Sequence, residues 1–183
     1  MYLKSVLSFA SFAALAVGAS IDDLLRDLQD IQSEVIDLDT AINAFPNVPT
    51  AADLVSAVNI HSTALSAGTM MNITTADIQT ITAPVSETEG TQIVNAINSL
   101  KSPVDTVLTS IVNKKCAFTL FTGLIPGIPA LNPVRVDFVQ LNSSASALGD
   151  ALISLVPTDL HDAVPATRTE ILNNFAVAIA AFT

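Results

Sequence analysis

Apolar residues recur at helical spacing in the segment from residue 20 to residue 45, which reads SIDDLLRDLQDIQSEVIDLDTAINAF. Successive apolar positions lie three or four residues apart, which places their side chains on one face of an α-helix. Seven carboxylates lie among the positions between them. Ser20, followed by the acidic Asp23, predicts the N-cap of this helix, and Pro46 predicts its end. The apolar positions are Ile21, Leu24, Leu28, Ile31, Val35, Leu38, Ile42 and Phe45.

Similar cap signals predict where later helices begin. Thr50, with Asp53 three residues on, begins a second amphipathic segment that we expect to fade around residues 68–72. The stretch Thr74-Thr75-Ala76-Asp77 repeats the cap pattern and predicts a short helical piece, which Pro84 ends or kinks.

The second half of the chain continues the helical spacing. Residues 86–115 predict one kinked helix or two helices, because Pro103 follows a serine in a pattern typical of a helix start. The glycines and prolines of residues 118–131 predict an apolar loop that exposes Phe121, Leu124, Ile125, Ile128 and Leu131 unless it folds inward. Residues 134–155 and 158–182 predict two more helices.

The whole pattern indicates an all-α fold. No segment alternates apolar and polar residues as a strand does, and valine and isoleucine fall at helical spacings instead. Connections of a few residues favour antiparallel neighbours. We therefore expect an up-and-down bundle of five to six amphipathic helices with an apolar core or tunnel.

The N-terminal residues 1–19 have the features of a secretory signal peptide. A lysine near the start precedes an apolar run too short to span a bilayer, and small residues follow it. We expect cleavage after Ala19, which leaves residues 20–183 as a single secreted helical domain. Two Asn-x-Ser/Thr sequons, at Asn72 and Asn142, predict glycosylation in such a chain.

Charge and cysteine content narrow the classes of partner. The chain has 17 acidic and 7 basic residues, a net charge of −10. Without Lys4 of the signal peptide, six basic residues remain, and 6 − 17 gives −11. This charge disfavours binding to nucleic acid or anionic membranes. With Cys116 as the only cysteine, stability must come from packing rather than disulfides.

Signatures of catalysis are largely absent from the sequence. It has no Gly-x-Ser-x-Gly elbow, no phosphate-binding glycine loop and no His-Glu-x-x-His pair. We expect His61, on the apolar face of its helix, to be a hydrogen-bonded core histidine, with a Cys116–His61 dyad as the weaker alternative. The carboxylates of the first helix are spaced around a helix rather than gathered in a calcium loop. We therefore expect no enzyme activity, no cofactor and no metal site.

The apolar content suggests the hypothesis that the chain has more apolar surface than its own core requires. Half of the residues are apolar, and they are mostly small or aliphatic, without tryptophan. Such residues can pack loosely and leave a cavity, or remain at the surface. The inward-facing positions that we expect to line a lipid site are Leu28, Ile31, Val35, Val58, Leu65, Ile97, Val107, Ile111, Phe138, Leu141, Leu148 and Phe175.

Several stretches together resemble one family. They are LKSPVDTVLTSIVNKKCAF (residues 100–118), SASALGDALISLVPTDL (144–160) and the ending ILNNFAVAIAAFT. With them the chain is similar to the fungal hydrophobic surface-binding protein A family, which includes lipid-binding domains of some cell-wall mannoproteins. The matching positions are Leu100, Pro103, Val104, Lys114, Lys115, Phe175, Ala178, Ile179 and Phe182.

The resemblance implies a secreted, helical protein that holds fatty acids in an apolar tunnel. We expect this protein to be a monomer. One alternative is adsorption to waxy or polymeric surfaces, with recruitment of a secreted hydrolase. A third is a structural cell-wall or protein-binding module. Mannoprotein relatives carry a lipid-anchor signal, whereas this sequence stops at Thr183 directly after its last helix. A free form, at most loosely associated with the wall, is therefore expected.

Overall fold

The computed structural model describes residues 18–82, 84–124 and 132–182, and its regular elements in these ranges are all helices. The predicted signal peptide falls almost entirely on residues outside them. Six α-helices and two 3₁₀ helices occur in the described ranges. They are α1 (Ile21–Ala44), η1 (Ala51–Asp53), α2 (Leu54–Ile78), α3 (Glu87–Asn113), α4 (Lys115–Gly123), α5 (Asn132–Leu155), η2 (Thr158–Leu160) and α6 (Ala163–Ala180).

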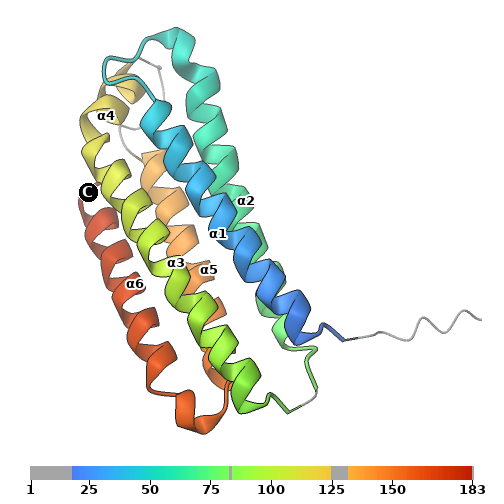
Figure 1. Cartoon of the computed structure of the whole chain (residues 1–183). Coiled ribbons are helices and arrows are strands. Elements are labelled where there is room, and N and C mark those ends of the chain that lie inside the picture. Colours follow the sequence, from blue (N-terminus) through green and yellow to red (C-terminus); the bar gives the residue numbers. More distant parts are fainter. Residues whose placement is uncertain (1–17, 83, 125–131, 183) are drawn as a thin grey trace, which may run out of the picture.

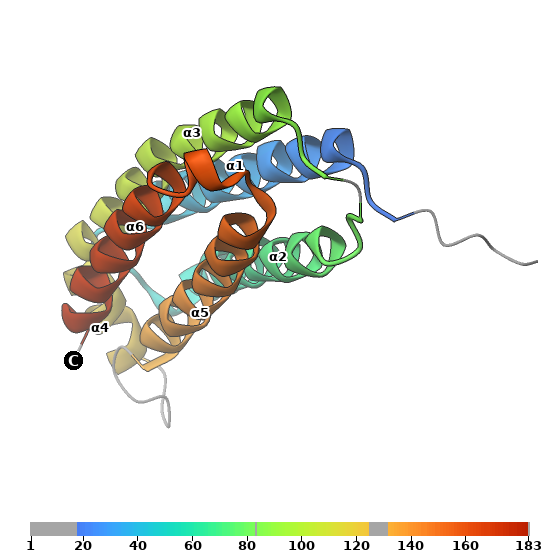
Figure 2. The same ribbon diagram turned by 90° about the horizontal axis from the view of Figure 1, so that it is seen from below.

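The five long helices form a closed ring. Their principal contacts run from α1 to α2, α2 to α5, α5 to α6, α6 to α3, and α3 back to α1. Figures 1 and 2 show the helices side by side around a common axis, with α3 between α1 and α6. The all-α bundle is therefore confirmed. Short connections do make α1–α2 and α5–α6 antiparallel pairs, but α3 runs parallel to both of its neighbours (Figure 1).

Two of the helix starts are closed by reciprocal side-chain bonds. The Ser20 hydroxyl accepts from the backbone N–H of Asp23 at 3.1 Å, and the Asp23 carboxylate accepts from the Ser20 N–H at 3.2 Å. Ser86 and Glu89 repeat the arrangement at the start of α3, at 3.3 and 2.9 Å. These bonds satisfy backbone donors that have no partner within the helix. The predicted start of the first helix is confirmed.

The second helix is longer than the sequence pattern predicts. It continues through Gly68 to Ile78, so the expected separate piece after Thr74 is its last turns. The hydroxyls of Thr69 and Thr74 donate to carbonyls four residues earlier at 2.8 and 2.9 Å, which keeps these polar residues compatible with the helix. Gly68 is buried against Leu141 of α5, where a Cβ would lie 3.7 Å from the leucine methyl.

Pro103 lies inside α3 and does not divide it. The helix therefore runs without interruption from Glu87 to Asn113, which decides between the two arrangements that the sequence allowed.

The first part of the expected apolar loop is also helical. Helix α4 begins at Lys115, and its Phe118 and Phe121 are buried. Both rings contact Phe45: Phe118 stacks on it with centroids 4.7 Å apart, and Phe121 meets it edge-on at 5.5 Å. Phe121 therefore follows the inward-folding alternative that the sequence allowed, because its ring completes this cluster, whereas Leu124 is exposed. Ile125, Ile128 and Leu131 lie outside the described residues.

The three phenylalanines define an aromatic plug at one end of the ring. The Lys114 ammonium reinforces it, donating to the carbonyl of Phe45 and to Asn47 Oδ1, the latter at 2.9 Å. The plug thus joins the end of α1 to the α3–α4 junction. No described helix is long and apolar enough to cross a membrane.

Candidate ligand-binding site

An apolar cavity of about 50 Å³ lies on the axis of the ring. Its lining comes from all five long helices, because each turns its apolar face inward. Arg168 is the only charged residue among those that line it in the described part of the chain. The lining residues are Ile31, Met71, Ile97, Leu100, Val104, Ala145, Leu148, Gly149, Leu152, Val164, Arg168, Ile171, Leu172 and Phe175.

The volume of the cavity limits what this closed form can hold. A dry protein cavity that binds benzene measures about 150 Å³. A cavity of about 50 Å³ is therefore too small for a long acyl chain. Uptake of such a chain requires the helices to move apart. The helix contacts are non-covalent, since Cys116, the one cysteine, is free.

Arg168 crosses from α6 to the surface of α5 at the edge of the cavity. Its Nη2 donates to Ser146 Oγ at 2.8 Å and to Asp150 Oδ2 at 2.9 Å. Its Nε is buried and has no hydrogen-bond partner in the described chain. The arginine stem lies directly over Gly149, where a Cβ would be 2.7 Å from Cδ. The arginine stem can pack here only because Gly149 has no side chain.

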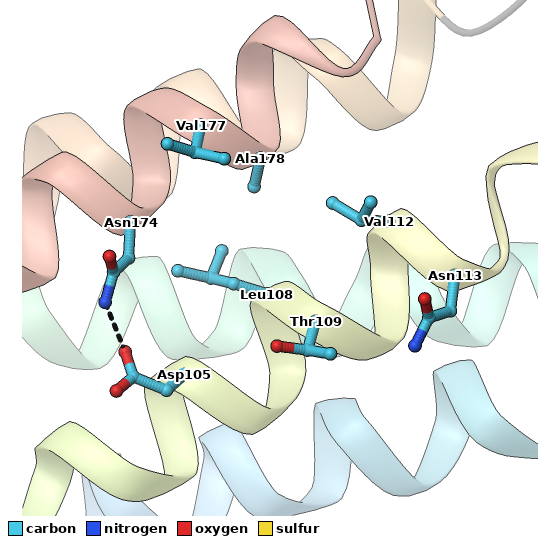
Figure 3. Close-up of a pocket in the computed structure, with 8 residues that line it drawn as sticks. All are labelled: Asp105, Leu108, Thr109, Val112, Asn113, Asn174, Val177 and Ala178. Atoms are coloured by element: carbon cyan, nitrogen blue, oxygen red, sulfur yellow. Dashed lines mark hydrogen bonds between the residues drawn. The ribbon is translucent and has the colours of Figure 1, made fainter.

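A second hollow, of about 430 Å³, is an open groove between α3 and α6. Figure 3 shows Leu108 and Ala178 facing each other across it, with Val177 nearby. At one edge Asn174 donates to Asp105 Oδ1 at 2.6 Å. The groove is larger than the cavity and partly apolar, but it presents a carboxylate, which repels an anionic headgroup.

Ten of the twelve predicted lining positions are buried. Four of them line the axial cavity: Ile31, Ile97, Leu148 and Phe175. The other six lie elsewhere in the core: Leu28, Val35, Val107, Ile111, Phe138 and Leu141. Whether these residues contact a ligand stays a prediction.

The inward orientation expected for Val58 and Leu65 is wrong. Their side chains are 56% and 40% exposed. Helix α2 instead buries the face that carries Ile60, Ala64 and Met71. Apolar residues occur all around this helix, so its spacing does not identify which face is buried. Sequence reasoning also missed Arg168. The available signal was its spacing of one, four and seven residues from Thr167, Val164 and Phe175, which are buried on α6.

His61 and Asp137 form a pair between α2 and α5. The imidazole Nδ1 lies 3.0 and 2.9 Å from the two carboxylate oxygens. Burial raises the pKa of Asp137, and the hydrogen bond from His61 offsets part of that rise. His61 itself is exposed, so the expectation of a core histidine is wrong. Cys116 is exposed on α4 and takes no part in this pair.

The two sequons differ in accessibility. Asn72 is exposed on α2, whereas Asn142 on α5 is half-buried and its Oδ1 is buried without a partner in the described residues. Both lie within helices. Glycosylation at either site stays a prediction, and Asn72 is the more accessible acceptor.

The segments at the plugged end of the bundle, where α2 and α5 begin and α4 lies (Figure 1), carry eight exposed apolar residues. Val55 is the most exposed of those on helices, at 79%. We call this set the apolar end. It comprises Val48, Leu54, Val55, Val58, Leu120, Leu124, Val136 and Val139.

Comparison with known proteins yields one family and several similar folds. The model of the family described as hydrophobic surface binding protein A matches residues 21–154. The structure of Afmp4p in complex with palmitic acid is 25% identical, with a TM-score of 0.77, and the match covers 90% of this chain and all of that one.

Two ligand-binding domains of the Penicillium marneffei MP1 protein, both complexed with arachidonic acids, share the fold. Domain 1 has a TM-score of 0.72 at 15% identity, covering 90% of this chain and 99% of that one. Domain 2 has a TM-score of 0.76 at 17% identity, covering 91% and 98%. No curated protein sequence matches the chain.

Proposed function

The chain belongs to the hydrophobic surface binding protein A family, and from this premise we propose that it is a secreted, non-enzymatic protein that holds the acyl chain of a fatty acid on the axis of its helical ring. The observation that carries the proposal is the axial cavity, to which all five long helices contribute apolar side chains. The likeness to Afmp4p, solved in complex with palmitic acid, supports it.

The binding energy follows from the chemistry of the cavity. Each methylene transferred from water contributes about 0.8 kcal/mol, so ten of them contribute about 8 kcal/mol before the cost of separating the helices. Opening the ring consumes part of this energy. Affinity should therefore increase with chain length once the chain is long enough to offset the opening cost.

Native mass spectrometry of the purified protein, followed by titration with saturated fatty acids of ten to eighteen carbons, tests the proposal. We expect a co-purified acyl ligand at defined stoichiometry and affinity that rises with chain length. Absent binding, or equal affinity across the series, would contradict an acyl-chain site.

Adsorption to hydrophobic surfaces is the second candidate function, and the apolar end favours it. A cluster of exposed aliphatic side chains can insert into wax or polymer while the acidic faces remain in water. Val55→Ser combined with Val58→Ser should weaken adsorption to a wax-coated quartz-crystal microbalance. Ile73→Ser, on the same helix but away from the apolar end, is the matched control. Equal adsorption by the three proteins would argue against this surface.

Further proposals concern partners and processing. We infer a monomer that is at most loosely held at the cell wall, carries glycans at Asn72 and Asn142, and recruits a secreted hydrolase when it is adsorbed. Size-exclusion chromatography with light scattering tests the first, and peptide mapping tests the glycans. A protein-binding module remains the third candidate. Loss of partner capture after substitutions on the acidic face of α1 would support it.

A further inference from the structure

We propose that Arg168 binds the carboxylate of the acyl ligand and thereby sets the orientation of the chain in the cavity. This inference rests on the proposed acyl-chain function and adds a specific headgroup partner to it. Arg168 is suited to the role because it lines the apolar cavity and is charged. A guanidinium offers a planar set of N–H donors that matches a carboxylate.

The arginine has unused hydrogen-bonding capacity at the cavity. Its Nη2 is held by Ser146 and Asp150, but its Nε is buried without a partner in the described chain. A buried donor without a partner is unfavourable, and an acceptor that reaches it removes the cost. A carboxylate placed against Nε provides that acceptor and matches the charge.

The present partner of Arg168 is easily replaced. The side chain of Asp150 is 63% exposed, so this ion pair is largely solvated and contributes little to stability. The ligand carboxylate can take its place while Ser146 continues to hold the guanidinium. Gly149 keeps the arginine stem against α5, because any larger residue would collide with it.

The neighbours of Arg168 along α6 continue the site for the tail. Ile171, Leu172 and Phe175 line the same cavity, three, four and seven residues further on. On a helix this spacing forms a single stripe about 10 Å long. A headgroup at Arg168 therefore directs the tail along α6 toward Phe175. The open groove between α3 and α6 lacks this arrangement, since none of the described residues that line it is an arginine or a lysine.

The test compares palmitate with its uncharged methyl ester by a fluorescence displacement assay near neutral pH. Wild-type protein should bind palmitate more tightly than the ester. Arg168→Met keeps a long apolar stem but removes the charge. It should lower the affinity for palmitate about tenfold or more, while the affinity for the ester changes less than twofold. Arg168→Lys should retain part of the preference.

Lys101→Met is the matched control, because it removes the same charge from α3, where Lys101 pairs with Glu170 and does not line the cavity. It should leave the preference for palmitate unchanged. Thermal unfolding of each variant verifies that it folds. If Arg168→Met lowers the affinity for both ligands equally, or lowers neither, the headgroup role is overturned, while the proposed acyl-chain binding is not. Failure of the wild-type protein to bind either ligand would refute both proposals.

Discussion

A larger side chain that fills the axial cavity should affect stability and ligand binding in different ways, so it separates the two roles of the cavity. Ala145 lines the cavity from α5, and Ala147 on the same helix is exposed. Ala145→Leu adds three carbons toward the axis, whereas Ala147→Leu adds the same atoms toward solvent. Both variants keep a residue of high helix propensity, so differences between them report on the cavity.

The expected effects have opposite signs. An unfilled apolar cavity costs about 24 cal/mol per Å³, so filling about 50 Å³ stabilises the fold by up to about 1.2 kcal/mol. For a domain of this size that raises Tm by about 2–5 °C. The same three carbons occupy space that the ligand needs. Excluding three methylenes, at about 0.8 kcal/mol each, costs about 2.4 kcal/mol, or roughly a fiftyfold loss of affinity.

Differential scanning calorimetry and palmitate titration of the two variants measure both effects. Ala147→Leu should change neither Tm nor affinity appreciably. Palmitate binding that is equally strong in both variants would refute the assignment of the acyl chain to the axis and would favour the open groove between α3 and α6. A strong fall in Tm for Ala145→Leu would show that the cavity cannot accept the side chain.

Three further substitutions test other parts of the structure. Ser86→Ala should cost about 1 kcal/mol of unfolding free energy at pH 7 in urea titrations, because it removes an N-cap. The bonds from Ser86 lower the pKa of Glu89, so the part of this contribution that passes through the Glu89 carboxylate is present above pH 4.5 and is lost as pH falls through the folded-state pKa. A penalty that does not decrease at all on acidification would contradict this. Phe45→Ala should cost about 3–5 kcal/mol by removing the centre of the aromatic plug, and a loss under 1 kcal/mol would show that the plug is dispensable. His61→Ala leaves Asp137 buried without its imidazole partner; because the raised pKa of Asp137 makes its charged form costly above that pKa, the destabilisation should be larger at pH 7 than at pH 3.5, and equal values would count against the pairing.

The sequence predicts where the helices lie in the chain better than it predicts which helices pack against one another. The first helix is found correctly because its carboxylates and its apolar residues lie on opposite faces. Helix α2 lacks that separation: Val58 is exposed and Ile60 is buried although both are aliphatic. The ring order is a further limit, since helical spacing does not say that α3 lies between α1 and α6.

The same limit explains why the arginine at the cavity was not foreseen. The contacts behind the proposed role of Arg168 are made with Ser146 and Gly149, which lie on another helix. Its spacing from the buried residues of α6 places it near their face of the helix but does not say what it contacts on another helix. Only the packing of α5 against α6 brings the cation to an apolar space.

The aromatic plug has a mechanical consequence for any ring that must widen. Three interlocking phenylalanines hold the end of α1 to the α3–α4 junction, so we expect α1 and α3 to separate least at that end and more with distance from it. In the orientation proposed above, the methyl end of the chain lies toward this narrower end, where a slender tail fits best. Such geometry favours unbranched hydrocarbons and rejects broad, rigid molecules such as sterols.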